Sequence, residues 1–248
     1  MPVRHPARGL FAALAGLSCL AAAGCAASQS AALAAHGQPP GSHGPSETSD
    51  GTPATASTVI PAQLGDTWVY AVNSSVLGKG TETNRISAVR PVAGGQRATL
   101  SSSLRLAASK EPFKFASDFI ASTDGSIKFA STSFMGAKLA SANVNWPSPA
   151  ALTPGRPRTS TVTGSFLGIK TTERVTVSEV GPAAVTVPAG SYQATLLEQT
   201  VTDRAGGRTV IKAWVVNGIG EVKSETTVIV KGQHEVSNVE TLTSFTKG

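Results

Sequence analysis

The sequence predicts an all-β domain in which about ten antiparallel strands form a curved sheet or half-barrel, or else a two-layer sandwich, with little helix. Two observations carry this prediction. Val- and Thr-rich segments between residues 59 and 248 alternate apolar and polar side chains with a period of two. Turn residues separate these segments at intervals of roughly ten residues, as they do in all-β folds. Windows of about 12 residues in this region lack a helical period with capping residues.

The first half of the domain supplies four of these strands. Residues 67–72 (Thr-Trp-Val-Tyr-Ala-Val) are β-branched or aromatic at most positions and open the domain. Residues 96–107 place Leu100, Leu104 and Leu106 on one face. Residues 119–123 and 126–130 flank an Asp-Gly pair, which is a strong signal for a hairpin turn.

The second half continues the pattern. Further strands are expected at residues 173–180, 193–203, 208–216, 221–230 and 235–246. The Arg-Ala-Gly-Gly segment at residues 204–207 predicts a hairpin between two of them. In residues 208–216 both faces are largely apolar, so we expect this strand to be covered on both sides.

The N-terminus has the features of an export signal. Arg4 and Arg8 precede an apolar run at residues 10–23, which is too short to span a bilayer as a helix. The run ends in Leu-Ala-Ala-Ala-Gly-Cys, which resembles a bacterial lipobox, although Ala22 stands where that family prefers Leu, Val or Ile. The resemblance implies that residues 1–24 are removed and that Cys25 carries acyl chains. The alternative is an ordinary secretory signal that leaves Cys25 as an incidental thiol.

Two further segments follow from composition. Residues 25–58 are rich in Ala, Ser, Gly and Pro, with Leu33 as the only large aliphatic residue, so we expect a disordered tether behind the lipidated Cys25. Residues 59–248 are long enough for one domain with its own core. We therefore expect a lipid-anchored protein on the extracytoplasmic face of the cell membrane, bound through the acyl chains on Cys25.

Three short blocks carry a family resemblance. They are Leu-Gly-Asp-Thr-Trp at residues 64–68, Val-Pro-Ala-Gly-Ser-Tyr at residues 187–192, and Trp-Val-Val-Asn-Gly-Ile-Gly-Glu-Val-Lys at residues 214–223. In this order they resemble uncharacterised bacterial envelope proteins, although residues 215–217 depart from that pattern. The resemblance implies a curved antiparallel sheet, distantly similar to LolA-like lipoprotein carriers, and no defined activity. In the blocks themselves, Pro188 and the Gly residues are expected to shape turns.

The residues that carry most chemistry are scarce in the predicted domain. It has one histidine, His234, and no cysteine, so we expect no catalytic residue, no metal site, no cofactor and no enzymatic activity. Asp66 is expected to cap a turn before the first strand. Trp68 and Trp214 are either core anchors or the walls of an apolar pocket.

The acidic residues are assigned to the surface. Glu221 with Glu225, and Glu235 with Glu240, are expected to be exposed side chains of strands. The formal charge of +6 is scattered along the chain, and basic residues form no cluster, which argues against nucleic acid as a partner.

Two functions from different classes remain open. In the first, the domain binds a lipid or another apolar ligand at the cell envelope, against the concave face of its sheet. In the second, it is a protein-interaction or structural module whose core is filled by its own side chains. An interior lined by Leu, Val and Phe has the same sequence pattern in both cases.

Overall fold

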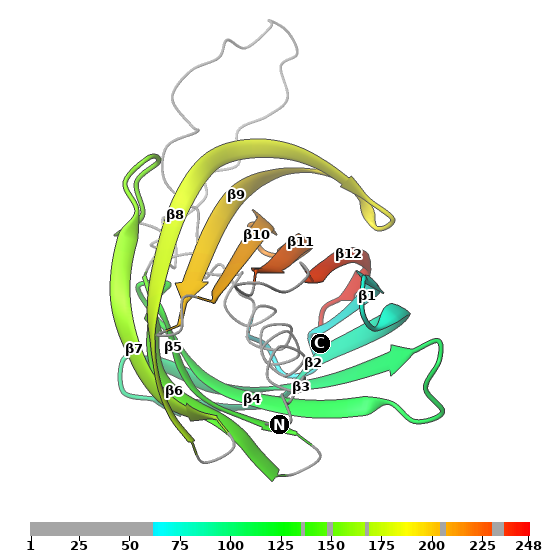
Figure 1. The fold of residues 1–248 in the computed structure, drawn as a ribbon, viewed down its shortest axis with the longest axis horizontal. Coiled ribbons are helices and arrows are strands. Elements are labelled where there is room, and N and C mark those ends of the chain that lie inside the picture. Colours follow the sequence, from blue (N-terminus) through cyan, green and yellow to red (C-terminus); the bar gives the residue numbers. More distant parts are fainter. Residues whose placement is uncertain (1–61, 135–136, 148–150, 167–168, 204–206, 230–235) are drawn as a thin grey trace, which may run out of the picture.

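A computed structural model of the chain describes residues 62–134, 137–147, 151–166, 169–203, 207–229 and 236–248. Within these residues the chain forms twelve β-strands and no α-helix (Figure 1). The strands are β1 Thr67–Ser74, β2 Gly78–Val92, β3 Gly95–Leu106, β4 Phe113–Ser122, β5 Ile127–Phe134, β6 Ala137–Trp146, β7 Arg158–Phe166, β8 Ile169–Val187, β9 Gly190–Thr202, β10 Arg208–Val216, β11 Gly220–Ile229 and β12 Val236–Thr246. The predicted all-β class is confirmed.

All strand pairs are antiparallel and follow the order of the chain. Each strand pairs with the next, and β1 also pairs with β12, so the curved sheet closes into a barrel within the described residues. The junction between β6 and β7 is the shortest, with three residue pairs. In Figure 1, β8 and β9 arch over one side of the molecule, opposite β2, β3 and β4. The sheet is a single continuous ladder, and the alternative of a two-layer sandwich was wrong.

Irregularities in the ladder help the sheet to bend. The longest strand, β8, shifts register against β9 between Glu179 and Gly181, where Gly181 has a φ of +133°. Such a bulge bends a strand and increases its twist, which agrees with the arch of β8 in Figure 1. Pro182 follows at this point, where an irregular ladder tolerates a residue without an N–H group.

Two of the turns expected from the sequence are formed, whereas the expected turn at residues 204–207 lies mostly outside the described residues. Val187 pairs with Gly190, so Pro188 and Ala189 make a two-residue connection between β8 and β9. Gly190 has a φ of +143°, a conformation that strains any other residue. The Asp-Gly hairpin also forms, but its connection between β4 and β5 is longer than expected. It spans residues 123–126, because the Gly125 N–H donates to the Ser122 carbonyl.

The apolar interior falls into two groups of buried side chains. The large apolar cluster includes Trp68, Tyr70, Ile86, Ala98, Leu100, Phe119, Ile127, Phe129, Leu152, Val162, Val175, Val177, Val185, Val187, Ala194, Leu197, Ala213, Val215, Val222 and Leu242. The small apolar cluster consists of Val72, Leu104, Leu106 and Phe115. Leu100, Leu104 and Leu106 all lie on the buried face of β3, as the alternation predicts.

Coverage of β10 differs from the expectation. Ile211, Ala213 and Val215 are buried on its inner face. On its outer face Lys212 is exposed and Trp214 is only partly buried, so this face is not fully covered. In the part of the chain that the structure describes, no helix has the length and apolar character needed to cross a membrane.

Candidate functional site

A belt of polar side chains lies inside the barrel. It consists of Ser74, Glu82, Asn84, Ser102, Ser117, Thr132, Glu221, Ser224, Thr226, Asn238 and Glu240, all buried. We call this set the interior polar belt. Its members come from β1 to β5, β11 and β12, which are neighbours around the closed sheet. The belt is therefore one feature of the fold and not a collection of isolated residues.

Strand periodicity places the belt on the inner face. Ser102 lies two residues from both Leu100 and Leu104, which belong to the large and the small apolar cluster respectively. Ser117 lies in the same way between Phe115 and Phe119. The belt therefore separates the two clusters along these strands.

Strand register connects the members of the belt sideways. Ser74 on β1 is opposite Asn238 on β12, which is opposite Thr226 on β11. Asn84 on β2 is opposite Ser102 on β3. Side chains at such cross-strand positions are close enough to interact, so the belt continues from one strand to the next.

Three glutamates of the belt form an acidic cluster of Glu82, Glu221 and Glu240. Their exposed fractions are 2%, 1% and 3%. The prediction that Glu221 and Glu240 are surface residues was therefore wrong. Glu240 lies two residues before the buried Leu242 and so shares its inward face. Of their expected neighbours, Glu225 does lie at the surface, and Glu235 lies outside the described residues.

A β-bulge explains the position of Glu221. Trp214 pairs with Lys223, whereas the next residue, Val215, pairs with Glu221. Val222 is the extra residue, and both Glu221 and Val222 are fully buried in succession. Regular alternation would put one of them outside, so the bulge brings the carboxyl group of Glu221 into the interior.

Burial changes the acidity of the cluster. It raises the pKa of Glu82 to about 7, and the Asn84 side chain partly offsets this rise. It raises the pKa of Glu221 to about 8, where the Ser224 hydroxyl opposes the rise and the charge of Glu82 adds to it. A carboxyl group that loses its hydration favours its neutral form.

Glu240 belongs to the same electrostatic unit. Burial, followed by the charges of Glu82 and Glu221, raises the pKa of Glu240 well above its usual range, and Asn238 partly offsets the rise. Asn238 Nδ2 donates to Glu240 Oε1 at 2.9 Å. Because the charges of the three carboxyl groups repel one another, the groups cannot ionise independently.

Many polar atoms of the belt lack a well-formed hydrogen bond. They are Glu82 Oε1, Asn84 Nδ2 and Oδ1, Ser102 Oγ, Glu221 Oε1 and Oε2, and Asn238 Oδ1. In folded proteins such buried atoms nearly always have a partner, whether protein, water or ligand. The belt therefore has unused capacity to bind a polar group.

Two aromatic residues of β1 hold the wall beside the acidic cluster. Tyr70 is opposite Glu82 in the ladder, and its hydroxyl donates to the backbone carbonyl of Glu221 at 2.8 Å. Trp68 Nε1 donates to the Ile219 carbonyl at 2.6 Å. These bonds fix the turn before β11 to β1, and they fix the backbone that presents Glu221.

The residues singled out from the sequence have different positions. Trp68 is buried in the large apolar cluster and stacks on Phe245, with ring centroids 5.3 Å apart. Trp214 is half-buried, with the ammonium group of Lys223 over its ring at 4.5 Å. Cys25, the expected lipidation site, lies outside the described residues, as does His234.

Asp66 is a buried acid of a different kind. Its Oδ2 accepts from the Gln63 N–H at 3.0 Å, and its Oδ1 accepts from the Gly248 N–H at 3.0 Å. It thus caps the turn before β1, as predicted, and also ties down residue 248. Both of its carboxyl oxygens have partners, in contrast to those of Glu221.

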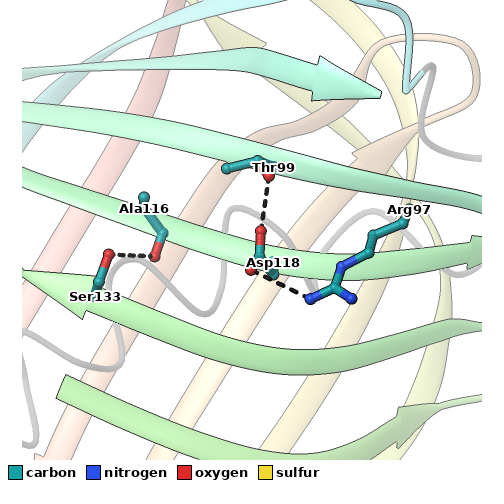
Figure 2. Close-up of polar contacts among 5 residues, drawn as sticks. All are labelled: Arg97, Thr99, Ala116, Asp118 and Ser133. Carbon is teal, nitrogen blue, oxygen red and sulfur yellow. Dashed lines mark hydrogen bonds and ion pairs between the residues drawn. The ribbon is translucent and has the colours of Figure 1, made fainter. Parts of the chain in front are cut away.

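The polar groups that alternate with the core residues of β3 and β4 are also paired. Figure 2 shows Asp118 between Arg97 and Thr99. The Thr99 hydroxyl donates to Asp118 Oδ1 at 2.7 Å, and the Arg97 guanidinium lies 3.5 Å from Oδ2. Nearby, the Ser133 hydroxyl donates to the Ala116 carbonyl at 3.4 Å. These polar side chains of β3, β4 and β5 thus have partners, in contrast to most of the unpaired atoms, which belong to the belt.

The chemistry available to the belt follows from its atoms. Among the described residues, no group of three or more His, Cys, Asp or Glu side chains is arranged to hold a metal ion. The unpaired atoms are mostly oxygen acceptors. Such a set can accept hydrogen bonds from a donor-rich organic group, and its carboxyl groups can hold protons.

No family model matches the chain, and comparison with curated proteins finds no relative. Among solved structures, a putative lipoprotein from Parabacteroides distasonis superposes with a TM-score of 0.51 and 12% identity, covering 75% of this chain and 97% of the other. A putative exported protein with YmcC-like fold from Bacteroides fragilis superposes with a TM-score of 0.49 and 16% identity, covering 75% of this chain and 98% of the other. The hypothetical lipoprotein YmcC from Escherichia coli superposes with a TM-score of 0.37 and 12% identity, covering 74% of this chain and 88% of the other. The Parabacteroides structure indicates a shared fold, and at this identity it indicates the fold alone.

Proposed function

We propose that this chain is an exported, lipid-anchored protein whose β domain binds a lipid or another apolar ligand at the cell envelope, without enzymatic activity. The observation that carries the proposal is the interior polar belt, whose unpaired atoms are buried next to apolar side chains. A binding site for an amphiphile needs this combination, because apolar walls supply affinity and a few polar groups fix orientation.

The anchor in this proposal rests on the sequence. The charged start, the short apolar run and the small residues before Cys25 are the features of a lipoprotein signal. A lipidated cysteine with two or more acyl chains is a stable anchor. The Parabacteroides protein that shares the fold is described as a putative lipoprotein, and we extend that description to this chain.

The absence of catalysis is also part of the proposal. The predicted domain has one histidine and no cysteine, so a nucleophile with an adjacent base would be difficult to assemble. Buried carboxyl groups alone serve as general acids in some enzymes. In this chain we assign them to binding, because they come with amide groups that have no role in proton transfer.

Mass spectrometry of the natural content tests the proposal. The full chain carrying Cys25→Ser would be exported, purified without detergent and extracted with organic solvent. A stoichiometric lipid or other apolar molecule in the extract is the expected result. A clean extract, together with no thermal stabilisation by added lipids, would contradict ligand binding and would favour a protein-interaction module with a filled core.

A further inference from the structure

The acidic cluster is buried without a compensating positive charge. Among the buried residues that the structure describes, three are the glutamates of this cluster and none is Lys, Arg or His. The other buried acid, Asp66, is satisfied by backbone N–H groups. Buried carboxylates in folded proteins are ordinarily paired. In the described part of the chain, the cluster has no side chain that could fill this role.

The amide groups beside the cluster are a second, independent observation. Asn84 is 1% exposed, lies on the inward face of β2 two residues from Glu82, and has neither its Nδ2 nor its Oδ1 in a well-formed hydrogen bond. Asn238 uses its Nδ2 on Glu240, but its Oδ1 has no partner. These are neutral groups, so repulsion between carboxylates does not account for their unpaired atoms.

The unpaired atoms define the chemistry of a partner. Five of the seven in the belt are carboxyl or amide oxygens. Amide oxygens, and carboxyl oxygens once they are ionised, only accept hydrogen bonds. Their partner must therefore donate several bonds, and a positive charge would strengthen each of them. The described residues form no metal-holding group, which favours an organic cation such as a primary ammonium.

The surroundings define the rest of the partner. Apolar side chains of both clusters adjoin the glutamates: Tyr70 of the large cluster and Leu104 of the small one lie opposite Glu82, and Val72 of the small one lies opposite Glu240. A fully hydrated cation gains nothing from such walls, whereas an alkyl chain does. We propose that the barrel binds an amphiphile with an ammonium head group, held by Glu82, Glu221 and Glu240 with Asn84 and Asn238. This inference rests on the proposed function and names its ligand class.

Protons compete with such a ligand. Without it, burial holds the carboxyl groups in their neutral form up to pH values near neutrality. The groups that face them from β1, β2, β11 and β12 are Tyr70, Asn84, Ser224, Thr226 and Asn238, none of them cationic. Binding of an ammonium group therefore releases protons, and its affinity rises with pH.

Three water-soluble probes of equal chain length test the proposal. Hexylamine, hexanol and hexanoate would be titrated into the purified full chain in a non-ionic detergent, by calorimetry and by thermal shift. We expect hexylamine to bind about tenfold or more tightly than hexanol, and hexanoate to bind least. Hexylamine binding should release protons, measured as a dependence of the binding enthalpy on the ionisation enthalpy of the buffer.

Neutral substitutions assign the effect to the cluster. Glu221→Gln and Glu240→Gln should each weaken hexylamine binding by about tenfold and weaken hexanol binding much less, so that the preference for the amine falls. The matched control is Glu225→Gln, also on β11, because Glu225 is partly exposed and forms an ion pair with Lys223. It should change neither affinity.

The outcomes separate this inference from the function on which it rests. If the three probes bind equally well, or if the Gln variants retain the preference for the amine, the cationic ligand is refuted while binding of an apolar ligand stands. If no probe binds and the extract of the purified protein is clean, both proposals fall. Proton release is measured on the unsubstituted chain, so it remains decisive if a variant does not fold.

Discussion

The buried glutamates should make the domain more stable in mild acid than in mild base. The unfolded chain releases their protons near pH 4.5, whereas the folded state retains them up to about pH 7 at Glu82 and about pH 8 at Glu221. Between these limits the folded state holds more protons, so the free energy of unfolding falls as pH rises. Each carboxyl group lowers it by about 1.4 kcal/mol per pH unit inside its window. Glu240 acts in the same direction.

A single neutral substitution should reduce this slope. From pH 5 to pH 7, Glu221 removes up to about 3 kcal/mol of the free energy of unfolding, and this contribution disappears in Glu221→Gln. The variant should match the unsubstituted protein near pH 5 and be more stable at pH 8. Local relaxation and water entry would reduce the magnitude but preserve the sign.

Urea unfolding of the full chain measures this effect. The transition would be followed by tryptophan fluorescence, to which the buried Trp68 contributes, at pH 5, 6, 7 and 8. Glu225→Gln serves as the control, because it removes an exposed carboxyl group from the same strand. A free energy of unfolding that is flat or rises from pH 5 to pH 8 would refute the reasoning. So would a Glu221→Gln variant with an unchanged slope.

Four further changes test the anchor, the turns and the core. Cys25→Ser should release the protein from the membrane or block its processing, as seen by fractionation and mass measurement. Asp66→Ala should lower the free energy of unfolding by about 2 kcal/mol, because two backbone N–H groups lose their acceptor. Gly190→Ala should cost about 1 kcal/mol or more at a φ of +143°. Phe119→Ala should cost about 3–5 kcal/mol, since the ring is fully buried. Urea unfolding measures the last three.

Most of the strands could be predicted because their residues carry an unambiguous period. Nine were located from alternation and turn residues, including β3 with its row of leucines and the hairpin around Gly125. The strands that were not predicted are β2, β6 and β7. Along its 15 residues β2 has two large aliphatic side chains besides its terminal valine, Ile86 and Val89, and β6 and β7 are rich in Ala, Ser and Thr. Without a contrast between two faces, periodicity carries no signal.

The closure of the sheet into a barrel could not be predicted from the sequence pattern. Alternation indicates which face of a strand is buried, but it does not distinguish a curved sheet from two stacked sheets. Closure depends on β1 pairing with β12, a contact between opposite ends of the domain. The bend of β8 depends on a register shift at Gly181, which only the paired strand reveals.

The acidic cluster was missed for two different reasons. Glu82 and Glu240 each lie an even number of residues before a buried aliphatic residue, Ile86 and Leu242, so their inward position could have been inferred from phase. The prior that glutamate is exposed overrode that signal. Glu221 offered no such signal, because a bulge at Val222 breaks the alternation.

The cost of burying the acidic cluster argues that its carboxyl groups have a bound partner. A barrel that needed only a filled interior could place Leu or Val at these positions and gain stability, since buried charges are often replaced by apolar residues without loss. A ligand that pairs with the carboxylates would offset their desolvation, and the fall in stability above pH 5 would then flatten in its presence. Repeating the urea unfolding series in the presence of hexylamine tests the pH dependence of stability and the proposed ligand together. A slope that is the same with and without the amine would mean that the carboxyl groups meet only protons and water.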